Sequence, residues 1–265
     1  MVEILGQDNL MNKIRSKTLD TFPRSLILNG EKGSGKHLIS NFISEHLGTP
    51  LIDITESISV EMLQDISEKP YPCLYLVDSD SKKFSIKQQN AILKFLEEPL
   101  LNAYIIVLCE NIDTLIETIK NRCQVWNILP YSKEILARFI ETSDNNLILS
   151  IARTPGRVKE IKAINLSDIF DLCYKLIDKI SVASYPNTLS ISNKISFDDV
   201  GPIPLYLFIE CLLYSISERQ KQGMMIPKYF YDLTLQLNRE YKIKNLDRKY
   251  IFERFLTNLW QGAHS

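Results

Sequence analysis

Short apolar runs alternate with amphipathic segments in the first half of the chain. Four runs have the length and composition of buried parallel strands, at residues 25–29, 51–54, 73–78 and 103–109. Apolar residues at helical spacing follow them, in segments that begin near residues 7, 37, 59 and 86. Strands that alternate with helices are typical of an α/β domain with a parallel sheet.

The second half of the chain shows helical periodicity. We expect a small helical segment from Pro130 and another after Thr154, whose hydroxyl can cap a helix with Pro155 at its first position. Apolar spacing predicts a helix from Asp168, and a Ser-, Asn- and Pro-containing connection is expected over 183–202. The spacing then predicts three more helices, at 203–219, 228–241 and 246–260.

Composition and charge narrow the class of protein. At 265 residues and 45% hydrophobic content, the chain can form two or three domains with substantial cores. Its net charge of −1 gives no overall attraction to nucleic acid, so a DNA contact would need a local patch or a partner chain. Residues 1–7 lack the basic and apolar regions of a signal peptide, and the apolar run at 203–216 is too short to span a membrane. We therefore expect a cytoplasmic protein that does not bind membranes.

The five cysteines are dispersed along the chain. They lie at positions 73, 109, 123, 173 and 211, too far apart in sequence for a Cys-x-x-Cys pair. We expect them to be buried as small apolar side chains in a reducing compartment. A zinc site is not expected.

The strand at 25–29 leads into a glycine-rich loop. Residues 30–37 read Gly-Glu-Lys-Gly-Ser-Gly-Lys-His, which is the phosphate-binding loop (P-loop) pattern with His in place of the usual Ser or Thr. Glycines allow backbone N–H groups to face phosphate oxygens, and the lysine can reach the terminal phosphates. The residues predicted to bind nucleotide in this loop are Gly30, Gly33, Ser34, Gly35, Lys36 and His37.

Two groups that a hydrolytic site needs are replaced. His37 stands where a hydroxyl would hold Mg²⁺, and imidazole is a poor ligand for this hard cation. Asp78 ends a strand at the Walker B position, but the next residue is Ser79, which cannot act as a base near neutral pH. Asp80 is the one nearby carboxylate that could replace that base. ATP binding without hydrolysis stays open, and Mg²⁺ binding is not favoured.

The segment from Ser85 to Pro99 is the most specific in the sequence. Ser85 and Gln88 predict a capping box that starts a helix, and Pro99 is expected to end it. Residues 90–99 read Asn-Ala-Ile-Leu-Lys-Phe-Leu-Glu-Glu-Pro, which resembles the Asn-Ala-Leu-Leu-Lys-x-Leu-Glu-Glu-Pro segment of the AAA+ clamp-loader subunits of bacterial DNA polymerase III. Residues 4–7, Ile-Leu-Gly-Gln, resemble the family's Ile-x-Gly-Gln segment, which lies against the adenine of bound nucleotide.

The resemblance implies a fold and an organisation. It implies an α/β P-loop AAA+ module, with a parallel sheet flanked by helices, then a small helical lid and an all-α C-terminal collar domain. The corresponding boundaries are 1–129 for the P-loop domain, 130–166 for the lid and 167–265 for the collar, which serves oligomerisation in the family.

The resemblance also assigns roles to single residues. Residues 118–123 resemble the family's Ser-Arg-Cys motif, with Asn121 in place of Ser. In the family that arginine acts in trans on the ATP of the neighbouring subunit, so the matching residue is Arg122. Arg157 matches the second sensor arginine of the lid. Glu110 stands where the family has a polar phosphate sensor, and a carboxylate there would repel phosphate.

Three lysines flank the start of the helix expected near residue 86. Lys82, Lys83 and Lys87 lie where assembled clamp loaders face the DNA backbone, and lysines suit phosphate. An ordinary solvated face is the alternative. The partners that the resemblance implies are gamma/tau-like and delta-like clamp-loader subunits, the sliding clamp and primed DNA.

The resulting hypothesis is a delta-prime-like subunit that does not hydrolyse ATP and supplies Arg122 to a neighbour. His37, Ser79 and Glu110 favour it over an ATP-hydrolysing motor subunit of the gamma/tau type, which would need Asp80 and an unusual metal site. A purely structural scaffold subunit is a further hypothesis. A metabolic P-loop kinase would need neither the segment at 90–99 nor the Arg122 motif.

Overall fold

The computed structural model of the chain contains two compact units. It describes residues 4–58, 66, 70–81, 84–97, 102–140, 145–198, 201–243 and 245–264. The first unit consists of Met1–Phe139 with Arg153–Arg157, and the second of Ile140–Ala152 with Val158–Ser265. The three-part division at 129 and 166 is a different one and stays a prediction.

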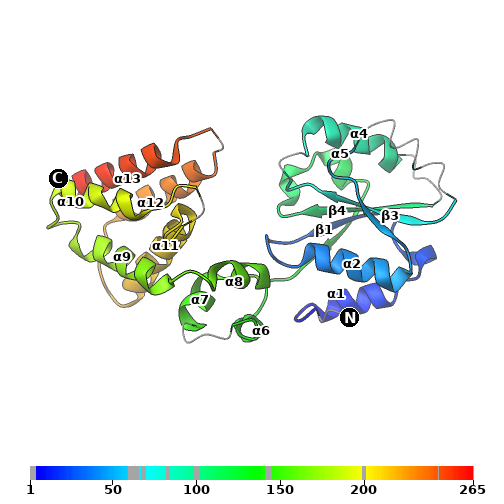
Figure 1. Ribbon diagram of the computed structural model, residues 1–265, viewed down its shortest axis with the longest axis horizontal. Coiled ribbons are helices and arrows are strands. Elements are labelled where there is room, and N and C mark those ends of the chain that lie inside the picture. Colours follow the sequence, from blue (N-terminus) through cyan, green and yellow to red (C-terminus); the bar gives the residue numbers. More distant parts are fainter. Residues whose placement is uncertain are drawn as a thin grey trace. The chain divides into compact units, whose positions relative to one another are not determined.

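A five-stranded parallel sheet forms the centre of the first unit (Figure 1). Its strands lie side by side in the order β2-β3-β4-β1-β5. They are β1 (Ser25–Asn29), β2 (Leu51–Asp53), β3 (Cys73–Asp78), β4 (Ala103–Cys109) and β5 (Gln124–Asn127). In an open parallel sheet, ligands bind beyond the carboxyl ends of the strands. The loops after β1, β3 and β4 therefore meet where a site is expected.

The four strands predicted from apolar runs are confirmed as β1 to β4. β5 is missing from the prediction. Its sequence, Gln-Val-Trp-Asn, has no apolar run that would predict a strand, and only Trp126 of the four residues is buried. Its pairing with β1, which joins Leu26 to Gln124 and Asn29 to Asn127, creates the strand.

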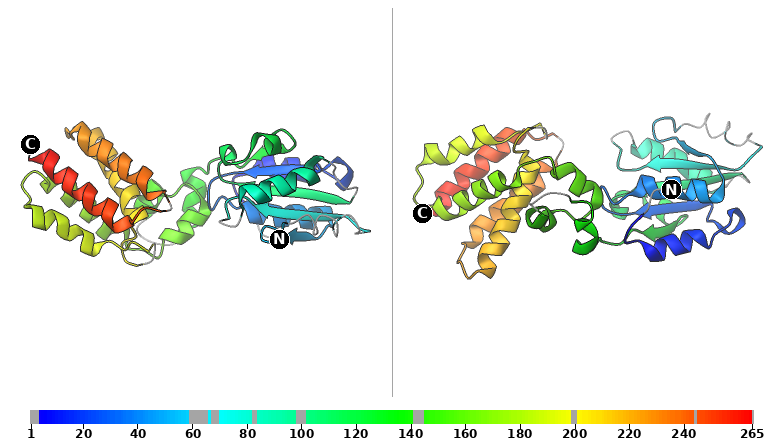
Figure 2. Two further views of the ribbon diagram at one scale, coloured as in Figure 1. Left: turned by 90° about the horizontal axis from the view of Figure 1, so that it is seen from above. Right: turned by 60° about the horizontal axis from the view of Figure 1, so that its bottom comes forward.

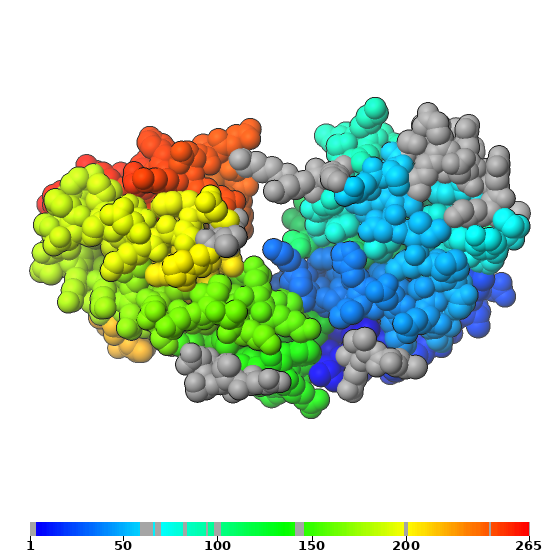
Figure 3. Space-filling view, in the orientation of Figure 1, coloured from blue at the N-terminus to red at the C-terminus, as the bar shows by residue number. Residues whose placement is uncertain are grey.

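Helices cover both faces of the sheet (Figures 1 and 2). α1 (Asp8–Arg15) and α2 (Lys36–Leu47) lie on one face, and α4 (Ile86–Glu97) and α5 (Glu117–Lys120) lie on the other. The blue surface of α1 and α2 is visible in Figure 3. α1 ends at Arg15, and Leu19 begins a separate 3-10 helix.

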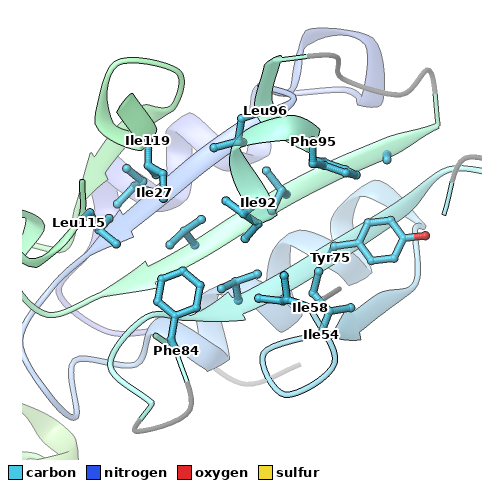
Figure 4. Packing of buried hydrophobic residues seen from close by; sticks show 14 of the residues in the cluster. Ile27, Ile54, Ile58, Tyr75, Phe84, Ile92, Phe95, Leu96, Leu115 and Ile119 are labelled. Carbon is cyan, nitrogen blue, oxygen red and sulfur yellow. The ribbon is translucent and has the colours of Figure 1, made fainter. Parts of the chain in front are cut away.

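Two apolar cores attach these helices to the sheet. Successive strand residues point to opposite faces, so Ile27 contributes to the core under α4 and Leu26 to the core under α1 and α2. Ile92 and Phe95 of α4 point toward the sheet in Figure 4. Burial of one such side chain contributes about 1.5–3 kcal/mol, so α4 is firmly attached.

The start of α4 agrees with the predicted capping box. The side chain of Gln88 accepts a hydrogen bond from the backbone N–H of Ser85 (2.7 Å). The stop expected at Pro99 lies outside the described residues, and so does the helix predicted at 59–67 apart from Ile66. Glu97 is the last residue of α4 that the structure describes.

The second unit is helical. It contains the end of α8 (Pro155–Ile161), and its other described helices are α7 (Asn145–Ile151), α9 (Leu166–Lys179), α10 (Tyr185–Leu189), the 3-10 helix Ser190–Lys194, α11 (Leu205–Lys221), α12 (Lys228–Tyr241) and α13 (Arg248–Ala263). The three long helices predicted near the C-terminus are confirmed as α11 to α13. The rings of Phe208 and Phe252 meet edge to face at 5.6 Å in its core.

One prediction for this unit is wrong. The stretch 183–202 contains α10 and the 3-10 helix, and is not only a connection. The polar composition of this stretch favoured a loop. Pro186 could have indicated a helix, because it lies in the first turn of α10, where a missing N–H costs nothing. Within the part of the chain that the structure describes, no helix is long and apolar enough to cross a membrane.

Candidate functional site

The glycine-rich loop lies between β1 and α2, at the carboxyl ends of the central strands. Lys36 is the first residue of α2, and Gly35 precedes it with a φ of +94°, which glycine adopts without the penalty of a Cβ atom. The N–H of Gly30 donates to the carbonyl of Cys109 at the end of β4 (2.9 Å). The strand, loop and helix therefore follow one another as the motif predicts.

The carbonyl groups of this loop are bound by the protein itself. Lys36 Nζ donates to the carbonyl of Gly30 (2.7 Å), inside its own loop. The hydroxyl of Tyr131, which follows β5, donates to the carbonyl of Ser34 (2.7 Å). Among the described residues, the buried hydroxyl of Ser34 has no hydrogen-bond partner. The loop is thus held in one conformation by contacts from two sides.

The segment 153–157 packs directly on the loop. Thr154 Oγ1 donates to the carbonyl of Lys32 (2.8 Å), and the N–H of Gly156 donates to the carbonyl of Gly33 (2.9 Å). A Cβ atom on Gly156 would lie 2.5 Å from the Cα atom of Gly33. Two glycines are needed here because the two backbones touch.

The ammonium group of Lys36 lies next to two carboxylates. Its Nζ is 3.6 Å from Asp80 Oδ2 and 3.8 Å from Glu110 Oε1, and the Lys36 side chain is only 8% exposed. Burial raises the pKa of the Asp80 carboxyl. Burial, and after it the charge of Asp80, raise the pKa of the Glu110 carboxyl. Two partly buried acids therefore share one ammonium group.

The remaining polar groups of the site also bond to one another. His37 Nε2 approaches Asp78 Oδ2 at 3.9 Å. Ser79 Oγ donates to the carbonyl of Leu108 (2.6 Å), and Asp80 Oδ1 accepts from the N–H of Glu110 (3.0 Å). Asp80, the one candidate for a replacement base, is thus bound by the lysine and by a backbone N–H.

This arrangement fits a bound Mg²⁺–ATP poorly. The hydroxyl that would hold the cation is replaced by His37, and a triphosphate that reached Lys36 would lie close to the charges of Asp80 and Glu110. Among the described side chains, no group of three or more His, Cys, Asp or Glu residues is arranged to hold a metal ion.

Arg122 has very different surroundings. It follows α5, and its Nη2 lies 3.0 Å from Glu97 Oε1 at the end of α4. Its Nη1 donates to the carbonyl of Thr118 (3.1 Å). The side chain is 36% exposed, although Ile119 before it is fully buried and burial raises the pKa of the adjoining Cys123 thiol to about 12. An anchored backbone therefore carries an exposed guanidinium group.

The other predicted site residues are placed as follows. Arg157 is in the first turn of α8 (Pro155–Ile161), which begins with the predicted cap, because its N–H donates to Thr154 Oγ1 (3.3 Å). Lys87 is exposed in the first turn of α4. Lys82 and Lys83 lie outside the described residues. The functional roles of these residues stay predictions.

Three polar side chains important to this unit are missing from the sequence prediction. The buried Gln89 accepts a hydrogen bond from the N–H of Ile116 (3.1 Å), which ties α4 to the segment before α5. Tyr131 binds the loop, and Glu97 binds Arg122. Only Gln89 left a signal, as a polar residue next to the apolar stripe of its helix.

Comparison with known proteins agrees with the sequence motifs. The sequence model of the family described as "DNA polymerase III, delta subunit" matches residues 52–132. The DNA polymerase III subunit delta' of Haemophilus influenzae is 23% identical over an alignment of 169 positions, and the match covers 58% of this chain and 49% of that protein. The chain is similar to delta-prime clamp-loader subunits. The resemblance seen at residues 90–99 is thus confirmed.

The delta-prime-like chain spans about half the length of this relative. Among solved structures it resembles a DNA polymerase III gamma subunit-related protein from Thermotoga maritima, with a TM-score of 0.53 and 16% identity, covering 97% of this chain and 100% of that one. A RuvB variant from Thermotoga maritima gives a TM-score of 0.51 and 12% identity, covering 85% and 97%. These likenesses show the fold, a parallel α/β sheet with flanking helices and C-terminal helices.

Proposed function

We propose that the chain is a delta-prime-like subunit of a clamp loader, which helps to load a sliding clamp onto primed DNA. Its neighbours would be gamma/tau-like motor subunits and a delta-like subunit. The sequence match over residues 52–132 supports this, because it contains both the segment at 90–99 and Arg122. The lid at 130–166 and the collar at 167–265, which serves oligomerisation in the family, would follow the P-loop domain.

The chain does not hydrolyse ATP itself in this proposal. His37 and Ser79 replace the groups that would hold the metal and activate water. Lys36, which would bind the terminal phosphates, is occupied by Asp80, Glu110 and two loop carbonyls. Loss of one such group costs several kcal/mol of transition-state stabilisation. The replacements at His37 and Ser79, together with the occupied Lys36, should therefore leave negligible turnover.

The chain acts instead on the ATP of the adjoining motor subunit, through Arg122. The observation that carries this proposal is the contrast in exposure, because Lys36 is turned into its own loop while Arg122 faces solvent from a fixed backbone. An arginine presented in trans stabilises the charge on a transferring phosphoryl group, and such a contact contributes about 10³-fold or more in rate.

The experiment is reconstitution with the motor subunits of the same organism, the sliding clamp and primed DNA. Arg122→Ala should slow hydrolysis at the adjoining site by about 10³-fold, so that the complex loses the share of turnover which that site supplies. Arg15→Ala is the matched control, since Arg15 is an exposed arginine of α1 on the opposite face of the sheet. It should leave the ATPase unchanged.

Two results would contradict the proposal. Equal ATPase with and without Arg122 would favour a scaffold subunit that has no part in any ATP site. Hydrolysis by the isolated chain, abolished by Lys36→Ala, would establish a motor subunit instead. The DNA contact is tested separately, because removing Lys87, Lys82 and Lys83 should weaken stimulation by primed DNA without changing basal ATPase.

A further inference from the structure

Arg122 is bound to the end of α4 by one ion pair. Its Nη2 lies 3.0 Å from Glu97 Oε1, while its Nη1 donates to the carbonyl of Thr118 (3.1 Å). The two contacts come from two different elements, the end of α4 and the start of α5. Together they restrict the rotation of a side chain that is otherwise long and mobile.

Both elements rest on the same core. Ile92 and Phe95 bury one face of α4 against the sheet, and Ile119 is fully buried under α5. The hydrogen bond from the N–H of Ile116 to the side chain of Gln89 joins α4 to the residue directly before α5. The carboxylate of Glu97 and the guanidinium group of Arg122 are therefore held at a fixed separation by packed structure.

The pair restrains Arg122 without using up its charge. An arginine has more N–H donors than the two contacts occupy, and its planar fork leaves the others able to bind an oxyanion. The Glu97 side chain is 52% exposed and the Arg122 side chain 36%, so water weakens the pair and no buried charge would be left behind when a phosphate approaches.

We propose that Glu97 is a positioning residue for Arg122, which holds the guanidinium group ready for the phosphate of the neighbouring subunit. The inference rests on the proposed function, because it needs Arg122 to act in trans. A group ordered before the reaction loses less conformational entropy when the transition state forms, so restraint by Glu97 raises the rate of hydrolysis.

The test compares three carboxylate variants in the reconstituted clamp loader. Glu97→Ala should lower the kcat of the complex by about two- to five-fold, the range expected for an exposed ion pair, with the KM for ATP unchanged. Glu97→Gln keeps an oxygen that can accept from Arg122, so it should restore part of the rate. Glu117→Ala is the control, because Glu117 is an exposed acid of α5 that pairs with Lys120 and not with Arg122.

A double variant shows whether Glu97 acts through Arg122. In the Arg122→Ala background, Glu97→Ala should have no further effect, since the group that it positions is gone. The effect of Glu97→Ala on the intact protein should shrink as salt is raised, because salt screens exposed pairs. A merely structural role for Glu97 would predict the same loss in both backgrounds.

Failure of this inference is distinct from failure of the proposed function. If Arg122→Ala slows the complex but Glu97→Ala behaves like Glu117→Ala, Arg122 acts without Glu97 and the inference is overturned. A faster complex after Glu97→Ala would also overturn it, because Glu97 would then compete with phosphate for the guanidinium group. If Arg122→Ala has no effect, the proposed function itself fails.

Discussion

Lys36 and Arg122 are two cations of the same unit that are held in opposite ways. Lys36 is 8% exposed and has two carboxylates and two loop carbonyls around its ammonium group. Arg122 is 36% exposed and has one exposed carboxylate and one carbonyl. The difference teaches that a motif residue binds an external anion only if its own protein leaves its charge available.

The availability of charge follows from where each residue lies. Lys36 faces the ends of β3 and β4, which carry Asp80 and Glu110, so its surroundings are acidic and partly dry. Arg122 lies at the end of a four-residue helix, where only Glu97 approaches its guanidinium group among the described acids. One unit can therefore hold one cation against its own acids and leave another exposed.

Removing each of the two cations in turn is the strongest test of this comparison. Arg122→Ala should reduce hydrolysis at the adjoining site by about 10³-fold, whereas Lys36→Met should change it by less than about twofold. Steady-state ATPase of the reconstituted complex measures both, with circular dichroism to verify that each variant is folded. Equal losses from both substitutions would mean that the two cations are not functionally different.

The contact between residues 153–157 and the phosphate-binding loop should contribute substantially to the stability of the first unit. Gly156→Ala should lower the free energy of unfolding by about 2–4 kcal/mol, from overpacking against Gly33 and the strained hydrogen bond. Gly48→Ala is the control, since Gly48 has a φ of +61° and nothing near its Cβ position, and should cost about 1 kcal/mol.

The measurement follows denaturation of the first unit alone. Trp126 is buried in that unit, and Trp260 lies in the other, so a Trp260→Phe background gives fluorescence from one unit. If Gly156→Ala is no more destabilising than Gly48→Ala, the segment does not hold the loop.

Removing the carboxylates of Asp80 and Glu110 should leave the charge of Lys36 available to an external anion. The double variant Asp80→Asn, Glu110→Gln should bind pyrophosphate at least about tenfold more tightly than the unaltered chain, because each nearby like charge costs about 1 kcal/mol or more. Isothermal titration calorimetry gives the two affinities. Adding Lys36→Met to the double variant should abolish the gain. A gain that survives this third change would place the anion elsewhere.

The smallest expected effect concerns the acids themselves. Burial and the charge of Asp80 raise the pKa of Glu110, so its ionised form is disfavoured in the folded protein. Glu110→Gln should therefore stabilise the chain at pH 7, by about a few tenths of a kcal/mol after allowance for the 38% exposure of the side chain.

The pH dependence of the stability gain from Glu110→Gln distinguishes an effect of the raised Glu110 pKa from a general change in stability. The gain should be complete above the raised pKa of the folded state and should disappear as the pH falls to the ordinary value of 4.5, because the folded native chain then binds its extra proton. Glu45→Gln, which removes an exposed acid of α2, is the control and should not reproduce this gain. A gain that grows toward acid pH would contradict the argument.

Much of this fold could be predicted because its signals are local. An apolar run predicts β4, and Thr154 followed by Pro155 predicts the start of α8. β5 could not be predicted, because its pairing with β1 and not its own sequence makes it a strand. The helix α10 could not be predicted for a different reason, since its composition is that of a loop.

The candidate site was predicted in its residues but not in their contacts. The sequence names Asp80 as a replacement base and Glu110 as a group that repels phosphate, whereas in the fold both bind Lys36. They meet because β3 and β4 are neighbours, which no local pattern reveals. The bond between Thr154 and Lys32 joins positions 122 residues apart, so it depends wholly on the tertiary fold.

The touching backbones of Gly33 and Gly156 restrict how this chain can evolve. A Cβ atom at either position would overlap the other backbone, so neither glycine can be exchanged while its counterpart stays in place. We therefore expect the two positions to covary across relatives. Lineages that moved the second segment away from the loop would be released from selection for glycine at both positions together.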